Sequence, residues 1–225
     1  MMGTAGSGDN PSPITPRQLL DSMYGNEPQL GSDGQLHAMD PATRIPRDEG
    51  ALLVQLHTTL KAQSTVEIGL GYGFSTVFFL MAMQESGSGG HHIAIDPSQH
   101  GYYHGIGATH AQLLRMQDRF TLIEEESAVA LPRLAAAGLQ AHLILVDGQH
   151  RFDNVLVDFF LADAICAPNG AIVFDDAWLP SIQKVVRFIR NNRRDYRYAA
   201  TDVQIAAVFH KVGSDDRPWN HYVDF

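Results

Sequence analysis

VEIGLGYGFST, at residues 66–76, is the stretch that decides the fold of this chain. It reads as an apolar strand ending near an acidic residue, then a Gly-x-Gly-x-Gly turn, then the start of a helix. Gly69, Gly71 and Gly73 carry no Cβ atom, so backbone N–H groups and a helix N-terminus can approach a ligand closely. We therefore expect a strand–turn–helix unit whose turn binds a ligand.

Short apolar runs alternate with helical patterns on both sides of this unit. Strands are predicted at residues 64–68, 92–95, 120–124, 141–146, 171–174, 196–201 and 205–211. Helices are predicted at residues 16–23, 47–63, 75–84, 110–115, 128–137, 154–166 and 181–191. This alternation is typical of an α/β fold with a Rossmann-like, doubly wound, mostly parallel seven-stranded sheet and helices on both faces.

The length of 225 residues fits one domain with a substantial core, which we place at residues 17–225. Residues 1–16 are small, polar and proline-rich, so we expect them to be disordered. Residues 17–47 contain many turn-forming residues and are expected to form a lead-in or lid.

The net charge of −9 argues against a nucleic-acid-binding surface, so the late cluster Arg187, Arg190, Arg193 and Arg194 is interpreted as a solvated helix face and its exit. No apolar run approaches the roughly 18 residues that a membrane span needs, and the N-terminus lacks the pattern of a signal peptide. We therefore expect a cytoplasmic protein. The single Cys166 excludes an internal disulfide, and its apolar surroundings predict a buried, unreactive thiol.

Acidic residues follow several of the predicted strands, at the edge where ligands bind in open α/β sheets. Asp96 follows the second strand of this alternation, where a carboxylate can accept both hydroxyls of a ribose. The alternative is a strand-end acid that only caps a loop. The preceding His91 and His92 are expected to be exposed.

Three further carboxylates, Asp147, Asp175 and Asp176, follow two neighbouring strands. Two carboxylates about 4 Å apart repel by about 4 kcal/mol at an effective dielectric constant of about 20. A converging set therefore requires a proton or a cation, and oxygen ligands favour a hard ion such as Mg²⁺. The alternative is that Asp175 or Asp176 caps a helix or forms an Asx turn. His150, in the same loop as Asp147, is a candidate general base or a loop histidine bonded to backbone.

The motif VEIGLGYGFST, followed along the chain by IAIDP, resembles the first two motifs of class I S-adenosylmethionine-dependent methyltransferases. LVDGQHRFDNVLVD followed by GAIVFDDAW is similar to the metal-dependent O-methyltransferases of the macrocin and mycinamicin type, with the catechol and caffeoyl-CoA enzymes more distant. The resemblance covers residues 47–225. It implies a Mg²⁺-dependent transfer of a methyl group from S-adenosylmethionine to a hydroxyl of a small-molecule acceptor, a vicinal diol of a sugar or a catechol-like compound.

The resemblance also implies roles for individual residues. Asp147, Asp175 and Asp176 would ligate Mg²⁺, with His150 and Asp147 as the catalytic residues. Some sugar-methylating relatives carry an acidic base two residues after the first metal aspartate, where this chain has Gln149. The residues implied to bind S-adenosylmethionine are Glu67, which would brace the turn, and Gly69, Gly71, Gly73, Ser75, Thr76, Asp96, Ser127 and Asp147.

Two alternatives remain open at this stage. A nucleotide-cofactor oxidoreductase would have the third glycine of its turn at position 74, which is Phe74. A non-catalytic S-adenosylmethionine-binding domain would need no acidic set. The acceptor pocket is expected to involve residues 24–47, 98–110 and 178–182, and the resemblance alone suggests a homodimer.

Overall fold

The computed structural model describes residues 14–225. Of the segment 1–16 that is expected to be disordered, residues 1–13 lie outside the described residues, whereas Thr15 and Pro16 belong to the start of the first helix. Within the described part, the predicted first helix is present as α1 (Pro16–Tyr24). Thr15 caps this helix, because its side chain accepts a hydrogen bond from the backbone N–H of Gln18 and the Gln18 side chain accepts one from the N–H of Thr15.

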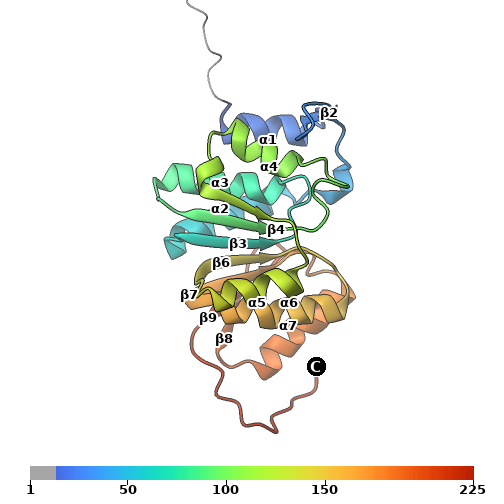
Figure 1. Ribbon diagram of the computed structural model, residues 1–225. Helices are drawn as coiled ribbons and strands as arrows, with labels where there is room; N and C mark the ends of the chain where they lie inside the picture. The colour runs from blue at the N-terminus through green and yellow to red at the C-terminus, as the bar shows by residue number, and fades with distance from the viewer. Residues whose placement is uncertain (1–13) are drawn as a thin grey trace, which may run out of the picture.

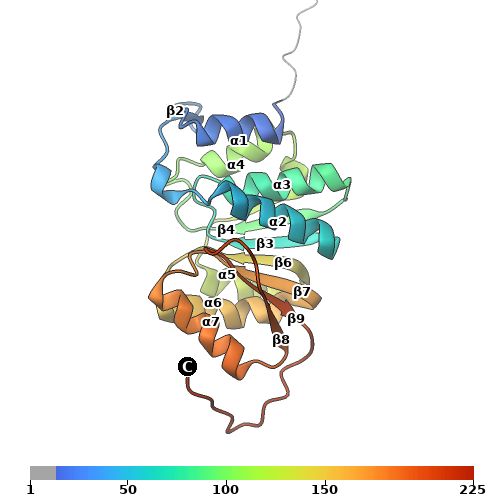
Figure 2. The ribbon, with the colours of Figure 1, turned by 180° about the vertical axis from the view of Figure 1, so that it is seen from behind.

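A seven-stranded sheet forms the centre of the molecule, as Figures 1 and 2 show from opposite sides. Five neighbouring strands are parallel, and the last two complete the sheet as antiparallel strands at one edge. The predicted fold class is confirmed. In spatial order the strands are β5 (Phe120–Ile123), β4 (His91–Ile95), β3 (Ser64–Ile68), β6 (Ala141–Val146), β7 (Cys166–Phe174), β9 (Ala207–Lys211) and β8 (Tyr196–Ala199).

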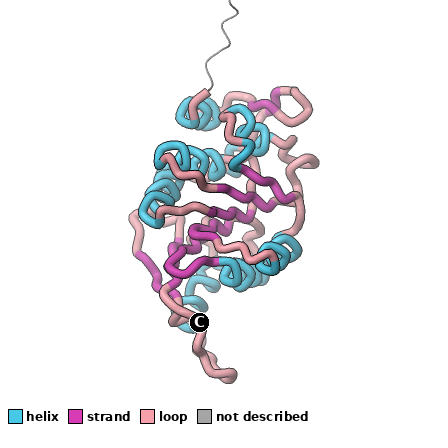
Figure 3. Tube along the Cα trace, turned by 60° about the vertical axis from the view of Figure 1, so that its left-hand side comes forward, coloured by secondary structure: helices cyan, strands magenta, loops and turns pink. Residues whose placement is uncertain are grey.

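Helices cover both faces of the sheet, which lies between two helical layers in Figure 3. On one face lie α1, α2 (Arg47–Leu60), α3 (Phe74–Ser86) and α4 (Ile106–Leu113); on the other lie α5 (Ser127–Ala136), α6 (Phe152–Ile165) and α7 (Pro180–Asn192). None of the helices within residues 14–225 is both long and apolar enough to cross a lipid bilayer.

Strand β6 shows why the central strands are rich in apolar residues. Its side chains alternate, so Leu143 and Leu145 pack into the core under α1–α3, whereas Ile144 and Val146 pack into the core under α5–α7. A parallel strand covered on both faces has no solvent-facing side, which accounts for the apolar run LILV at residues 143–146.

The strand order places a reversal between β3 and β6. The chain proceeds from β3 outward to β4 and β5, then returns to form β6 on the other side of β3. The connections at the carboxyl ends of β3 and β6 therefore leave in opposite directions, and the crevice between them is where open α/β sheets bind ligands.

A two-stranded hairpin, β1 (Gln29–Leu30) and β2 (Leu36–His37), lies in the lead-in and was not predicted. It contacts the loop after β4, because the backbone N–H of Ser32 donates to the carbonyl oxygen of His104 at 2.8 Å. The rings of His37 and His104 also stack, with centroids 3.8 Å apart. The lead-in and this loop thus form one joined wall.

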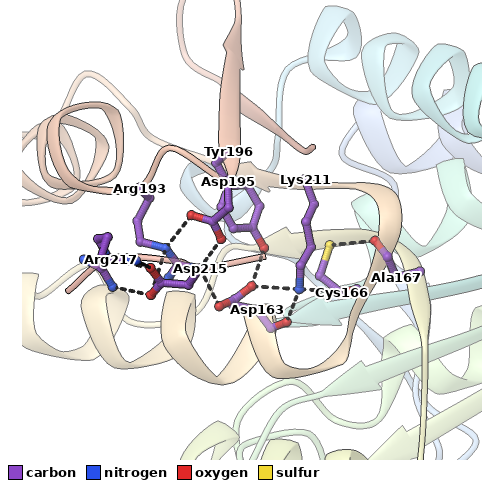
Figure 4. Close-up of polar contacts among 9 residues, drawn as sticks. All are labelled: Asp163, Cys166, Ala167, Arg193, Asp195, Tyr196, Lys211, Asp215 and Arg217. Carbon is purple, nitrogen blue, oxygen red and sulfur yellow. Dashed lines mark hydrogen bonds and ion pairs between the residues drawn. The ribbon is translucent and has the colours of Figure 1, made fainter. Parts of the chain in front are cut away.

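Arg193 is not on a solvated helix exit, contrary to prediction, because it is 2% exposed. Figure 4 shows its guanidinium between Asp163 and Asp195, at 2.6 Å from a carboxylate oxygen of each. Asp163 also accepts a hydrogen bond from the Tyr196 hydroxyl at 2.8 Å and pairs with Lys211 at 2.9 Å. These contacts join the end of α6 to β8 and β9, and the charged residues are therefore structural.

The beginning of β7 also differs from prediction. Cys166 belongs to this strand rather than to the preceding helix, and it pairs with Ala141 across a register irregularity. Its burial is confirmed, and burial raises the pKa of the thiol to about 11, which leaves it protonated and unreactive at neutral pH.

Candidate active site

The glycine turn after β3 packs against the loop after β6. Gly69, Gly71 and Gly73 have φ values of +91°, +54° and +85°. A Cβ atom on Gly69 would lie 2.0 Å from the carbonyl oxygen of Asp147, and one on Gly73 would lie 2.8 Å from Cα of Gly107. Two of the three glycines therefore permit backbone-to-backbone contact as well as a left-handed conformation.

Asp96, at the end of β4, holds this turn in place. Its Oδ2 atom accepts hydrogen bonds from the backbone N–H groups of Leu70 at 3.0 Å and Gly71 at 2.9 Å, and from Nε2 of Gln99 at 3.0 Å. Its Oδ1 atom accepts from the N–H of Ser98 at 2.8 Å. Asp96 therefore fixes the conformation of the turn and lies beside it.

Glu67 lies beneath the turn and is fully buried. Its carboxylate accepts hydrogen bonds from Ser75 at 2.7 Å and from Thr76, and Nε2 of His92 lies 3.2 Å from it. The expectation that His92 is exposed is thus wrong, since it is fully buried beside Glu67. Glu67 ties the last residues of β3 to the first turn of α3, in the bracing position that the sequence suggested.

A cavity of about 390 Å³ opens over the carboxyl ends of the central strands. Its lining includes the glycine turn, the end of β4, the loop after β6 and the end of β7. Residues 42–45 of the lead-in, Tyr103, the first turns of α5 and α6, and Ile205 before β9 also line it. Of the segments expected to shape an acceptor pocket, residues 178–182 do not line it.

The acidic residues after β6 and β7 converge on one side of this cavity. Asp147, Asp175 and Asp176 all line it, together with His150. The imidazole of His150 bridges two of the carboxylates, with Nε2 3.4 Å from Asp147 and Nδ1 3.5 Å from Asp176. Asp176 also accepts a hydrogen bond from the indole N–H of Trp178 at 2.8 Å.

The proximity of these groups shifts their pKa values. Burial raises the pKa of Asp147 well above its usual range, and burial likewise raises the pKa of Asp175. The hydrogen bond with Asp147 raises the pKa of His150, since it stabilises the imidazolium form. Asp147 and Asp175 therefore hold their protons more readily than exposed aspartates do.

Glu49 is a member of this cluster that sequence reasoning missed. It lies in the first turn of α2, is fully buried, and neither carboxylate oxygen has a hydrogen-bond partner among the described residues. Burial, and then the neighbouring Asp175, Asp147 and Asp176, raise its pKa to about 10. A signal was present in the sequence: Glu49 precedes Leu53 by four residues, on the apolar stripe of an amphipathic helix.

A metal ion is not pre-coordinated by this arrangement. Within residues 14–225, no group of three histidine, cysteine or acidic side chains stands ready to hold one. The carboxylate chemistry nevertheless suits a hard cation, so the predicted Mg²⁺ site at Asp147, Asp175 and Asp176 is taken up below as a proposal.

Residues 66–177 match a family model described as a methyltransferase domain, and the match runs from within β3 to just beyond Asp176. This segment is a methyltransferase domain. The expectation of a methyltransferase is confirmed for this segment. No curated protein sequence matches the chain.

Solved structures share the fold over most of the chain. An O-methyltransferase from Bacillus cereus in complex with SAH (S-adenosylhomocysteine) has a TM-score of 0.65 and 18% identity, covering 77% of this chain and 84% of that protein. The O-methyltransferase TomG from Streptomyces achromogenes, in complex with SAM (S-adenosylmethionine), has a TM-score of 0.64 and 18% identity, covering 77% and 83%. The SAH-bound methyltransferase PaMTH1 from Podospora anserina has a TM-score of 0.63 and 14% identity, covering 77% and 81%.

The methyltransferase domain brings most of the predicted cofactor-binding residues to the cavity, whereas three of them support it from below. Lining the cavity are Gly69, Gly71, Ser75, Asp96, Ser127 and Asp147, and outside its lining are Glu67, Gly73 and Thr76. Ser127, at the start of α5, donates a hydrogen bond to Asp158 at 2.6 Å, and Asp158 also lines the cavity. Ser127 therefore orients a second buried carboxylate on the cofactor side.

Proposed function

We propose that this chain transfers the methyl group of S-adenosylmethionine to a hydroxyl of a small-molecule acceptor, with Mg²⁺ or another hard divalent cation at the acidic cluster. One observation carries the proposal: a single cavity is lined by the glycine turn with Asp96 on one side and by the acidic cluster with His150 on the other. A methyl donor and an acceptor hydroxyl need such adjacent subsites.

The cofactor side of the cavity supports S-adenosylmethionine as the donor. The turn offers backbone atoms at close approach, and the carboxylates of Asp96 and Asp158 can accept hydrogen bonds from sugar hydroxyls or ring amino groups. The O-methyltransferases from Bacillus cereus and Streptomyces achromogenes share this fold and hold SAH or SAM. Their low identity to this chain leaves the acceptor undefined.

The acidic cluster supports a hard cation on the acceptor side. Asp147, Asp175 and Asp176 would hold the cation, because carboxylate oxygens prefer Mg²⁺, Ca²⁺ or Mn²⁺. Three carboxyls on one wall of the cavity can together supply the oxygen ligands that such a cation needs. When bound, such a cation lowers the pKa of an acceptor hydroxyl and orients it, which favours vicinal diols and catechols.

His150 is the candidate general base for the acceptor hydroxyl. It is on the cavity wall, and each of its ring nitrogens faces a carboxylate, Nε2 toward Asp147 and Nδ1 toward Asp176. A proton accepted on either nitrogen is stabilised by the facing carboxylate. Gln149, also on the wall, has no basic group and can only orient a substrate by hydrogen bonds.

The rest of the rate enhancement would come from positioning. Methyl transfer is an in-line displacement, so the cavity must hold the sulfonium methyl and the acceptor oxygen in line and exclude water. Proximity and orientation of this kind contribute up to about 7–11 kcal/mol to a two-substrate reaction. Residues 42–45 and Tyr103 also line the cavity and are the walls available for an acceptor.

The first test is calorimetric binding of S-adenosylhomocysteine, with NAD⁺ as the control ligand, followed by activity on a panel of vicinal diols and catechols. We expect micromolar S-adenosylhomocysteine binding and no response to NAD⁺; the reverse would favour the oxidoreductase alternative. Asp175→Asn/Asp176→Asn should lose turnover while retaining cofactor binding. Full turnover in excess EDTA would refute the cation but not the methyltransferase reaction.

A further inference from the structure

His92 is a buried histidine that can touch neither the methyl donor nor the acceptor. It lies in β4, is fully buried and is absent from the lining of the cavity. Ala94, on the same face of the strand, is apolar and also fully buried. An imidazole in such a place costs free energy unless its nitrogens find polar partners, so its contacts indicate its role.

Both ring nitrogens of His92 face the neighbouring strand β3. Nδ1 lies 2.8 Å from the hydroxyl oxygen of Thr65, and Nε2 lies 3.2 Å from Oε1 of Glu67. The Nε2 contact is not aligned as a hydrogen bond, so it acts through the charge and dipole of the ring. The rings of Phe79 and Phe120 stack against the imidazole, with centroids at 4.5 and 6.0 Å. The ring is therefore held in one orientation, with one nitrogen at the Glu67 carboxylate.

Glu67 depends on this contact for its electrostatic compensation. Within residues 14–225, His92 is the only Lys, Arg or His side chain at ion-pair distance from the Glu67 carboxylate. The other side-chain contacts of the carboxylate are hydroxyl groups, from Ser75 at 2.7 Å and from Thr76. A buried carboxylate left with hydroxyl donors alone loses part of the compensation for its desolvation. His92 thus contributes to holding Glu67 in place.

The hydroxyls that Glu67 binds belong to the wall of the cavity. Ser75 and Thr76 are the second and third residues of α3, and Ser75 lines the cavity together with Phe74. The first N–H groups of a helix have no partner within the helix, so they are available to the anionic end of a ligand. A series of contacts therefore leads from His92 through Glu67 to the cavity wall.

We propose that His92 is a positioning residue for the methyl donor: it keeps the Glu67 carboxylate in the orientation that sets Ser75 and the first turn of α3 at the cavity. This inference rests on the proposed function, because it requires S-adenosylmethionine to bind beside this turn. It does not depend on a cation at the acidic cluster. Residues that act on a ligand without touching it change its affinity by roughly 2–30-fold.

The test measures binding of S-adenosylhomocysteine to the full chain by calorimetry, for wild type, His92→Leu and His92→Gln. Leucine fills the space without a polar group, whereas the glutamine amide can still donate to Glu67. His91→Leu is the matched control, because His91 precedes His92 in β4, points to the opposite face and has its Nε2 2.8 Å from the Thr121 hydroxyl. The melting temperature without ligand is recorded for each variant.

We expect His92→Leu to weaken S-adenosylhomocysteine binding about tenfold, and His92→Gln and His91→Leu to stay within about threefold of wild type. A double-mutant cycle shows whether the effect passes through Ser75. In a Ser75→Ala background, which removes one hydroxyl bound by Glu67, His92→Leu should weaken binding by less than about threefold. If His92→Leu does not fold, Thr65→Val, which removes the contact to Nδ1, should weaken binding about threefold with the same dependence on Ser75.

An equal loss of affinity in His92→Leu with and without the Ser75 hydroxyl would overturn the inference, since the effect would not pass through that contact. An equal loss in His92→Leu and His92→Gln would also overturn it, because packing against Phe79 would then be the cause. Unchanged affinity in folded His92→Leu, or in Thr65→Val where it replaces that variant, would have the same meaning. These outcomes leave the proposed function intact, whereas a wild-type protein that does not bind S-adenosylhomocysteine would contradict the proposed methyl transfer itself.

Discussion

Replacing Gly69 with alanine should separate the two loops that build the active site. The added Cβ atom would lie 2.0 Å from the carbonyl oxygen of Asp147 and 2.6 Å from its carbonyl carbon. Both are backbone atoms, so no side chain can rotate away and one loop must move. Since Asp147 belongs to the acidic cluster and Gly69 to the cofactor turn, the movement widens the cavity between the two substrates.

The magnitude has two parts. An L-residue held at the φ of +91° found at Gly69 costs about 1–2 kcal/mol, in the range for left-handed backbone. Forcing the overlapping backbone apart adds about 1–3 kcal/mol, as for other overpacked sites. The total of about 2–5 kcal/mol should lower the melting temperature by roughly 4–20 °C, at about 2–4 °C per kcal/mol for a domain of this size.

Gly87→Ala is the matched control, because Gly87 also has a positive φ, +62°, but a Cβ there would meet nothing within 4 Å. It should show the conformational part alone, about 1–2 kcal/mol. Urea unfolding gives both free energies, and calorimetry gives S-adenosylhomocysteine affinity, which should fall only in Gly69→Ala. Equal destabilisation of the two variants, with unchanged cofactor binding in both, would refute the reasoning.

Three other outcomes follow from the contacts described above. Arg193→Met should lower the free energy of unfolding by about 3–5 kcal/mol, because Asp163 and Asp195 lose their buried partner. S-adenosylhomocysteine affinity should stay unchanged, and a loss of stability below about 1 kcal/mol in urea unfolding would argue against this role. Asp96→Asn should weaken S-adenosylhomocysteine binding at least about tenfold in calorimetry, because a neutral amide accepts the hydrogen bonds from the N–H groups of the turn more weakly than a carboxylate does. Equal affinity would show that the turn keeps its conformation without the charge of Asp96. Burial lowers the pKa of His110 to about 3, so the neutral imidazole is the form that folding favours. Its contribution to the free energy of unfolding is complete above about pH 6.5 and falls by up to about 1.4 kcal/mol per pH unit below it. Urea unfolding at pH 7.5 and 5.5 should therefore show a smaller pH dependence for His110→Gln than for wild type.

The parts of the fold that could be predicted from sequence are those whose local pattern fits only one type of secondary structure. Strands β3 and β6 have the predicted bounds, because β3 is followed directly by Gly69 and β6 by Asp147, which mark where each strand ends. The start of α4 at Ile106 was missed, since the preceding loop is rich in glycine and tyrosine and carries no helical period. The two-residue strands of the hairpin are too short to show alternation at all.

Burial of charged residues was the main part of the site that sequence could not supply. Arg193 and His92 were interpreted as exposed from their polarity, yet both are buried because their partners come from distant segments. Glu49 was not predicted as part of the site, because it lies on a helix face rich in leucine, whose pattern predicts only core packing. Asp147, Asp175 and Asp176 were found because strand ends converge by topology alone.

The hydrogen bond between Ser32 and His104 has a consequence for how acceptor choice can be changed in this protein. Residues 42–45 and Tyr103 both line the cavity, and the hairpin, which precedes residues 42–45 in the chain, contacts the loop containing Tyr103. If a loop from another enzyme replaces only one of these segments, it will pack against a segment whose shape complements the original loop. The two therefore form a single exchangeable module, and redesign of specificity has to transplant residues 29–45 and 98–105 as a pair.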